Sequence, residues 1–214
     1  MARATKPVRK PRRSYHHGNL RRALLDEALA TIRNEGVEGV TLREIGARLG
    51  VSRTALYRHF ADKRALLAAV ATEGFRSLRQ QLTAAWEESG RGQAAFQSMG
   101  VAYVRFAIIS PSHYRVMFGG FVTATTREPG LAAEAAGAFQ ALVDALAALQ
   151  RDRAVRADDI LLMARFVWAV VHGIAMLAID GQLGEQGGVE DLMGYALHRL
   201  RNGIDAPKRN RNRP

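Results

Sequence analysis

The stretch "GVSRTALYRHFADKRALL", residues 50–67, combines a turn signal, a helix start and a high density of hydrogen-bond donors. Its long or aromatic polar side chains are Arg53, Tyr57, Arg58, His59, Lys63 and Arg64. Side chains of this kind are unfavourable in a core unless they are paired. We therefore expect the segment to present its donors to a partner outside the protein.

The residues just before this stretch predict a helix that meets it across a tight turn. In "TLREIGARLG", 41–50, Thr41 and Glu44 have the spacing of a capping box. Gly50 tolerates the positive φ of a sharp turn, and Ser52 is a favoured residue at a helix start. Gly46 leaves room for a second helix to cross closely. Leu42, Ile45 and Leu49 of the first helix, and Leu56 and Phe60 of the second, form the inward faces.

Two short helices joined in this way predict a helix-turn-helix, whose second helix lies in the major groove of DNA. An arginine donates two hydrogen bonds to guanine, and threonine offers a hydroxyl or a methyl group. The predicted contacts to bases are Arg43, Arg53 and Thr54, and those to phosphates are Thr41, Tyr57, Arg58, His59 and Lys63. The alternative is a solvated helix face with His59 buried.

The charge distribution agrees with a nucleic-acid partner. Residues 1–66 hold fifteen Lys and Arg against six Asp and Glu, residues 67–206 hold twelve against fourteen, and residues 207–214 add four cations. The net charge of +11 therefore sits at the two ends of the chain. A basic end on a near-neutral body is typical of nucleic-acid binding. A pair of solubilising tails is the alternative.

The remaining chain predicts helices only, since no window shows the alternation of a strand. We expect nine helices and an all-α fold, with a disordered basic arm at 1–14 and a DNA-binding domain at 15–66. A helical ligand-binding and dimerisation domain follows at 67–206, and a basic tail at 207–214. Besides the two helices of the helix-turn-helix, the expected helices are a first one within 18–36 that Gly36 ends, a long one to about Glu88, and others at 92–109, from Pro111 to about 120, 130–153, 157–180 and 188–202.

Several classes of protein are disfavoured. The chain has no cysteine, and it lacks the common nucleotide-binding and hydrolase motifs, so we expect no enzyme and no cofactor. His16 and His17 lack a third ligand, so we expect no metal site. No secretory signal follows the N-terminus, and the apolar run 166–179 has only 14 residues. We expect a cytoplasmic protein without membrane contact.

The C-terminal body concentrates apolar and aromatic side chains at helical spacing. Such stripes line small-molecule pockets or simply fill a core, and both interpretations stay open here. The candidate pocket residues are Tyr103, Phe106, His113, Met117, Phe121, Met163, Phe166, Val170 and His172. Gly173 and Ala175 would allow close approach of another helix, which favours a dimer contact through the last two helices.

Residues 15–67 closely resemble the DNA-binding domain of the TetR family of bacterial transcriptional regulators. The segments "SPSHYRVMFGG", 110–120, and "WAVVHGI", 168–174, resemble the WHG type of C-terminal domain in that family. The resemblance implies a homodimer of nine- or ten-helix protomers, with a C-terminal domain that binds a small molecule and releases DNA. It also implies the base and phosphate contacts named above.

The function expected from the sequence is a repressor that binds a palindromic double-stranded operator as a dimer and is released by a small, mostly apolar ligand. One alternative is a DNA-binding regulator or architectural protein with a filled C-terminal core and no ligand. A helical enzyme with incidental charge is the other.

Overall fold

The computed structural model describes residues 20–122, 130–184 and 188–204, and over these residues the chain forms nine helices and no β-strand. The helices are α1 (Leu20–Glu35), α2 (Leu42–Leu49), α3 (Arg53–Tyr57), α4 (Lys63–Glu88), α5 (Gln93–Ile109), α6 (Pro111–Phe118), α7 (Leu131–Arg151), α8 (Ile160–Ile179) and α9 (Gly188–Ile204). The predicted all-α, nine-helix fold is confirmed. The arm at 1–14, the pair His16-His17 and the tail at 207–214 lie outside the described residues.

Local side-chain caps explain where the first helices begin and end. Thr41 accepts the backbone N–H of Glu44 at the start of α2, and Ser52 accepts that of Ala55 at the start of α3. Gly50 ends α2 in the left-handed conformation, with φ +66°. These three features were predicted from the residue types alone. Gly46 lies where α2 meets the next helix, since a Cβ there would approach Leu56 Cδ1 to 2.7 Å.

The turn at Gly50 gives a stability prediction. Gly50→Ala should lower the free energy of unfolding by about 1–2 kcal/mol, because a Cβ disfavours the left-handed conformation. No atom lies within 4 Å of an added Cβ, so the cost is conformational rather than steric. Gly203→Ala is the control, because its φ is not positive and its surroundings are also open. Urea unfolding followed by circular dichroism should show a loss only for Gly50→Ala; equal stability of the two variants would contradict the left-handed turn.

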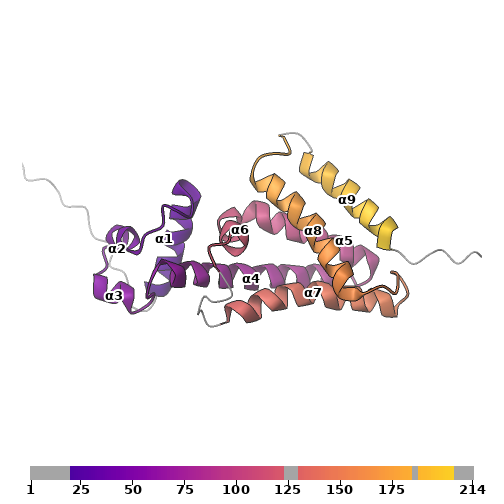
Figure 1. Ribbon diagram of the computed structural model, residues 1–214, viewed down its shortest axis with the longest axis horizontal. Helices are drawn as coiled ribbons and strands as arrows, with labels where there is room; N and C mark the ends of the chain where they lie inside the picture. The colour runs from indigo at the N-terminus through magenta and orange to yellow at the C-terminus, as the bar shows by residue number, and fades with distance from the viewer. Residues whose placement is uncertain (1–19, 123–129, 185–187, 205–214) are drawn as a thin grey trace, which may run out of the picture.

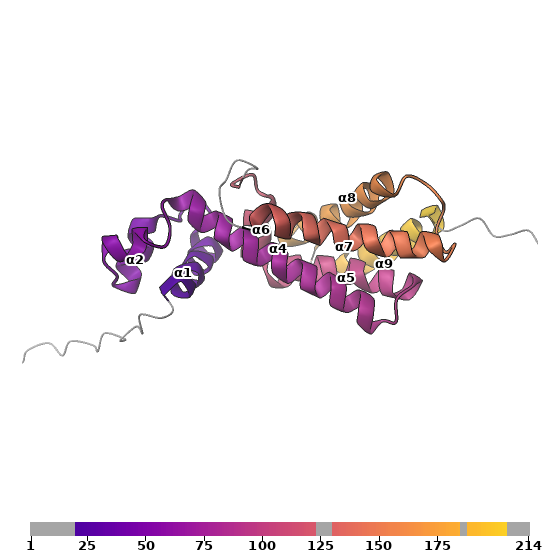
Figure 2. The same ribbon diagram turned by 90° about the horizontal axis from the view of Figure 1, so that it is seen from below.

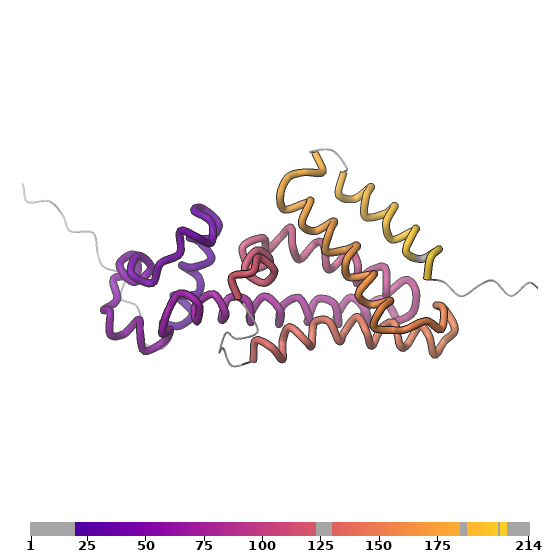
Figure 3. Tube along the Cα trace, viewed as in Figure 1, coloured from indigo at the N-terminus to yellow at the C-terminus, as the bar shows by residue number. Residues whose placement is uncertain are grey.

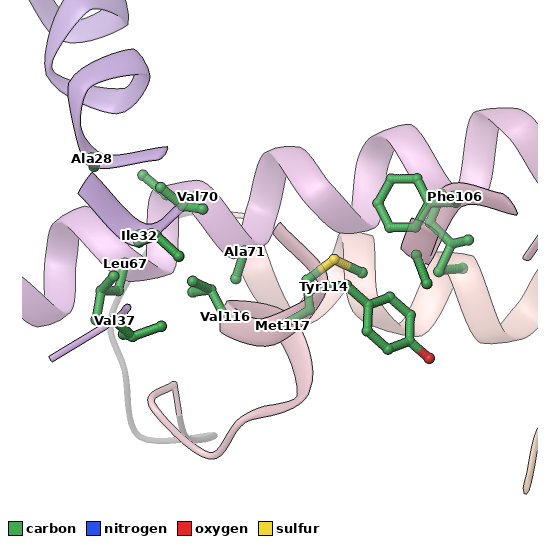
Figure 4. Packing of buried hydrophobic residues seen from close by; sticks show 14 of the residues in the cluster. Ala28, Ile32, Val37, Leu67, Val70, Ala71, Phe106, Tyr114, Val116 and Met117 are labelled. Atoms are coloured by element: carbon green, nitrogen blue, oxygen red, sulfur yellow. The ribbon is translucent and has the colours of Figure 1, made fainter. Parts of the chain in front are cut away.

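Helix α1 shares a core with α4. Ala28 and Ile32 of α1 pack near Leu67 and Val70 at the beginning of α4 (Figure 4). All four side chains are at most 4% exposed. Helix α1 therefore packs directly on the first turns of α4, and α2 packs in turn against α1.

Helix α4 connects the two ends of the molecule. It runs from the end formed by α1–α3 into the body, where α5, α6 and α7 pack against it (Figures 1 and 3). The turned view shows the same order, with α1 and α2 at one end and α5–α9 at the other (Figure 2). Helices α8 and α9 lie side by side, and α8 also packs against α5 and α7. Helix α4 is therefore the element that joins α1, α2 and α3 to the body.

Two helices, α7 and α8, are long and apolar enough to cross a membrane by length and composition alone. The apolar run 166–179 belongs to a helix of 20 residues, so its predicted shortness does not decide the matter. The packing is more informative, because α8 buries Met163, Val167 and Val171 against the body. A helix of this kind is also common in the core of a soluble protein.

Candidate nucleic-acid interface and internal cavity

Most of the side chains predicted to contact DNA are exposed on α2, on α3 or directly after α3. They are Arg43, Arg53, Thr54, Tyr57, Arg58 and His59. The exposure of His59 contradicts the alternative in which this side chain is buried. A hollow between α2 and α3 is bordered by Arg43, Arg53 and Tyr57, so the two helices bring these residues to one surface. The Arg53 guanidinium lies over the Tyr57 ring, 5.6 Å from its centroid.

Ion pairing separates the cations of this end of the molecule into two groups. Arg48 of α2 is bound by two glutamates of α1, with N–O distances of 2.6 and 3.4 Å, and it fastens α2 to α1. By contrast, Arg43, Arg53 and Arg58 make no ion pair with any described residue. Exposed arginines without an internal carboxylate partner are available to an external anion.

Thr41 and Lys63 differ from the other predicted phosphate contacts because their side chains already hydrogen-bond to other residues of the protein. The Thr41 hydroxyl donates to the Glu44 carboxylate at 3.0 Å, besides capping α2. The Lys63 ammonium donates to the Glu38 carbonyl oxygen at 3.2 Å and lies 3.8 Å from the Glu38 carboxylate. A contact from Lys63 to a phosphate therefore requires this side chain to leave Glu38.

A cavity of about 220 Å³ lies inside the C-terminal body, among helices α4 to α9. It is lined by Phe75, Leu78, Leu82, Phe96, Met99, Gly100, Tyr103, Phe118, Ala135, Ala138, Phe139, Leu142, Val167, Trp168, Val171, Leu197 and Leu200. The lining is almost wholly apolar. The C-terminal body thus combines a packed core with a partly open apolar space.

One wall of the cavity carries a hydrogen-bonded aromatic cluster. The Trp168 indole N–H donates to the Tyr103 hydroxyl at 3.0 Å, and the Tyr114 hydroxyl also donates to it at 3.0 Å. Nδ1 of His172 lies 2.7 Å from the Tyr114 hydroxyl and 3.2 Å from that of Tyr103. Burial raises the pKa of Tyr103 to about 12 and also raises the pKa of Tyr114, so both phenols are neutral. The ring of Tyr114 stands beside α4 in Figure 4.

The predicted list of pocket residues needs correction, because Tyr103 is its only member that lines this cavity. Phe106, Met163 and Val170 pack in or against the hydrophobic core. His113 and Met117 lie against Gly74 of α4, and Phe121 lies against Gly119. His172 belongs to the hydrogen-bonded aromatic cluster, and Phe166 is exposed. Other residues of the same helices line the cavity instead, notably Phe118 and Trp168. Tyr114 does not line it but hydrogen-bonds to Tyr103, which does.

A small rotation explains the misses on α8. The predicted residues there were 163, 166, 170 and 172, whereas 167, 168 and 171 line the cavity. One residue turns a helix face by about 100°. Because nearly all of α8 is apolar, hydrophobicity could not indicate which face is inside. A usable signal was the Trp168–His172 spacing of i, i+4, which places both polar groups on one face.

The two partly buried histidines, His113 and His172, predict a pH dependence of stability. Burial lowers the pKa of His172, and burial is also the main cause of the lowered pKa of His113, which faces Glu73 and Arg22 of opposite charge. Below their ordinary pKa of 6.5 the unfolded chain binds protons that the folded chain excludes. The free energy of unfolding should therefore be constant with respect to these groups above that pH and fall as the pH drops below it.

Urea unfolding at about pH 7.5 and about pH 5.5 measures this effect. Carboxylates also titrate toward the acid end, so the informative quantity is the difference between the wild type and a variant that lacks one histidine. His172→Gln and His113→Gln should each show a smaller loss of stability on acidification. A loss equal to that of the wild type in both variants would contradict the assignment.

No three His, Cys, Asp or Glu side chains gather closely enough to hold a metal ion within the described part of the chain. The titratable groups near the cavity are the tyrosines and the histidine of the aromatic cluster.

Family models of known proteins match both the N-terminal helices and the C-terminal body. Residues 24–70 match the family model described as "Bacterial regulatory proteins, tetR family", and residues 96–200 match the model described as "Tetracyclin repressor-like, C-terminal domain". The first match covers α2, α3 and most of α1. The second covers the helices that line most of the cavity.

Individual relatives extend the agreement. The chain is 32% identical to the HTH-type transcriptional regulator YobS of Bacillus subtilis (strain 168), itself uncharacterised, over 45% of this chain and 50% of that protein. It is 49% identical to the class C tetracycline repressor of Escherichia coli, over 24% of this chain and 23% of the repressor. The matched segments therefore span half or less of these curated relatives.

Solved structures match over nearly the full length. A protein with unknown function from Rhodococcus sp. RHA1 is 31% identical, with a TM-score of 0.80 over 90% of this chain and 99% of that one. A bacterial regulatory protein in the tetR family from Rhodococcus RHA1 has a TM-score of 0.67 at 19% identity, over 88% and 98% of the two chains. The latter likeness concerns the fold.

Proposed function

The chain belongs to the TetR family of bacterial transcriptional regulators, and from this premise we propose that it is a cytoplasmic repressor. It binds a palindromic operator as a homodimer and releases it when a small, mostly apolar molecule fills the cavity. The observation that carries the proposal is the exposed set of Arg43 on α2, Arg53 on α3 and Arg58 at the end of α3, none of which makes an ion pair with a described residue.

The DNA contacts divide into two kinds. Arg43, Arg53 and Thr54 contact base edges, because they surround or adjoin the hollow between α2 and α3. The phosphate contacts are Thr41, Tyr57, Arg58, His59 and Lys63, which lie at the helix ends and rims. Of these, Thr41 and Lys63 act only after exchanging their present partners for phosphate oxygens.

The dimer forms through α8 and α9. One face of α8 carries apolar or small residues that are exposed to solvent in the protomer or, at Gly173, partly exposed. They are Leu162, Phe166, Ala169, Gly173 and Leu177, at spacings of three and four residues. An added Cβ at Gly173 meets no atom within 4 Å, so a helix of a second copy can approach closely there. An apolar stripe of this kind is typical of a helix that packs against a partner.

The position of the cavity connects ligand binding to DNA binding. Phe75, Leu78 and Leu82 of α4 line the cavity, and the same helix begins at Lys63 beside the DNA-binding face. The helix has 26 residues, so one rigid element joins the two sites. A ligand that fits only one position of α4 changes the separation of the two α3 helices, which must match the spacing of successive major grooves.

Footprinting with the purified dimer upstream of its own gene and of neighbouring genes tests the proposal. We expect protection of two half-sites related by a two-fold axis, about one helical turn apart or a multiple of it. Affinity should fall steeply with salt, as for other proteins that bind phosphates. Absence of any protected site, with only sequence-independent binding, would contradict the proposal.

A further inference from the structure

The cavity lining carries no charged side chain, and its only side-chain polar groups are the Tyr103 hydroxyl and the Trp168 indole N–H. Moving an ion into such a space costs far more than moving a neutral molecule, because nothing replaces its hydration. The indole N–H is already used, since it donates to Tyr103. The polar chemistry of the cavity therefore depends on the Tyr103 hydroxyl.

The hydrogen bonds of the cluster determine which way this hydroxyl points. Tyr103 accepts from Trp168 and from Tyr114, so both lone pairs of its oxygen are used. The 2.7 Å contact between Tyr114 and His172 Nδ1 must contain a proton, because two lone pairs would repel at that distance. Since the Tyr114 proton is committed to Tyr103, the proton in this contact belongs to Nδ1 of His172.

The Tyr103 proton is then left without an acceptor in the cluster. Its nearest remaining neighbour is His172 Nδ1 at 3.2 Å, but this nitrogen already carries a hydrogen in the arrangement above. A buried hydroxyl proton without an acceptor costs free energy, and Tyr103 is only 5% exposed. An acceptor placed in the cavity beside Tyr103 would remove that cost.

We propose that the cavity selects uncharged apolar molecules that carry a carbonyl oxygen, and that the Tyr103 hydroxyl donates the hydrogen bond that recognises it. The inference rests on the proposed function in that it specifies the chemical class of the effector. Trp168, Tyr114 and His172 act as positioning residues, because they occupy the lone pairs of Tyr103 and turn its proton toward the cavity.

A second proton arrangement makes the opposite prediction. If Tyr114 donates to His172 and Tyr103 donates to Tyr114, the Tyr103 oxygen offers the cavity a lone pair. The cavity would then select a ligand donor such as a hydroxyl group. The two arrangements are distinguished by comparing ligands that differ only in this group.

The experiment measures binding of nonane, methyl heptyl ketone, nonanol and nonanoate to the full-length protein in the absence of DNA. Trp168 fluorescence is the signal, in a Trp86→Phe background that leaves it as the only tryptophan. We expect the ketone to bind about three- to tenfold more tightly than nonane, as one hydrogen bond to a neutral group provides. Nonanol should bind less tightly than the ketone, because its own proton finds no acceptor in the lining, and nonanoate should bind more weakly than nonane. An alcohol that binds more tightly than both ketone and nonane, or a ketone no better than nonane, overturns the inference.

Variants assign the effect to one hydroxyl. In Tyr103→Phe the ketone and nonane should bind equally, while nonane affinity stays as in the parent protein. Tyr195→Phe is the matched control, since it removes a hydroxyl from an exposed tyrosine outside the cavity, and it should keep the ketone preference. A ketone preference that survives in a folded Tyr103→Phe overturns the inference.

The infrared carbonyl stretch of the ketone gives a readout that needs no variant. On binding to the parent protein it should shift to lower frequency than in nonane solution, because the oxygen accepts a hydrogen bond. An unshifted stretch for the bound ketone overturns the inference.

Failure of this inference and failure of the proposed function give different results. A ketone that binds as expected without releasing the operator contradicts the effector role of the cavity but leaves its chemistry intact. Operator release by ligands with no carbonyl preference leaves the repressor function intact and contradicts only the chemistry.

Discussion

Phe166→Glu is expected to convert the dimer into folded monomers and to weaken operator binding by about a hundredfold or more. Phe166 lies in the middle of the uncovered α8 stripe and is 53% exposed in the protomer, so the substitution costs the isolated fold little. In the dimer the same carboxylate would be buried against apolar side chains without a partner. A monomer then holds one half-site and loses the gain of binding two linked half-sites at once.

Sedimentation measures the oligomeric state, circular dichroism the helix content, and fluorescence anisotropy the operator affinity. Ala136→Glu is a suitable control, because it adds the same charge to an exposed position on α7, away from the proposed contact. It should remain dimeric and bind the operator almost as well as the parent protein, apart from a small charge effect. If Phe166→Glu remains dimeric with unchanged affinity, the dimer contact lies on another surface.

The helix-turn-helix was predictable because short-range chemistry determines it. The Thr41 and Ser52 caps, the Gly50 turn and the close crossing at Gly46 each follow from a residue type at a fixed spacing. The inward side chains Leu56 and Phe60 are buried as expected, although Phe60 lies beyond the end of α3, which stops at Tyr57. Such features need no knowledge of distant contacts.

The state of each donor was not predictable, because it depends on residues far along the chain. Arg48 and Arg53 look alike in sequence, but the α1 glutamates bind Arg48, and Arg53 makes no ion pair with a described residue. Lys63 is held by Glu38, 25 residues earlier. Which cations are available to DNA is therefore a property of the folded domain.

The cavity was harder still to predict from sequence, because it is an absence of packing between six helices. The helical stripe on α5 correctly indicated an inward face, but core and cavity lining have the same composition. The polar cluster joins residues 58 to 69 positions apart through hydrogen bonds, and no local pattern encodes such a set. Only tertiary contacts show that Tyr103 lines the cavity whereas Phe106, on the same helix, is packed in the core.

The other large effect is expected at the DNA-binding face. Arg53→Ala should lose about 1–3 kcal/mol per half-site on the preferred operator, and about twice that for the dimer, because a bidentate contact to guanine is removed twice. The preference at one base pair of each half-site should also disappear. Stacking on Tyr57 already restrains the Arg53 side chain beside the hollow, so little of its freedom remains to be lost on binding.

Two companion variants separate base recognition from general attraction. Arg53→Lys keeps the charge but cannot make the forked contact, so it should lose base preference while the salt dependence of binding stays as in the parent protein. Lys63→Ala should weaken operator and scrambled DNA by the same factor, because phosphates carry no sequence information. Selection of bound sequences from a random pool measures preference, and titration against salt measures charge contacts. If Arg53→Ala selects the same sequences as the parent protein, then Arg53 contacts the backbone, and Arg43 and Thr54 become the residues that distinguish one operator from another.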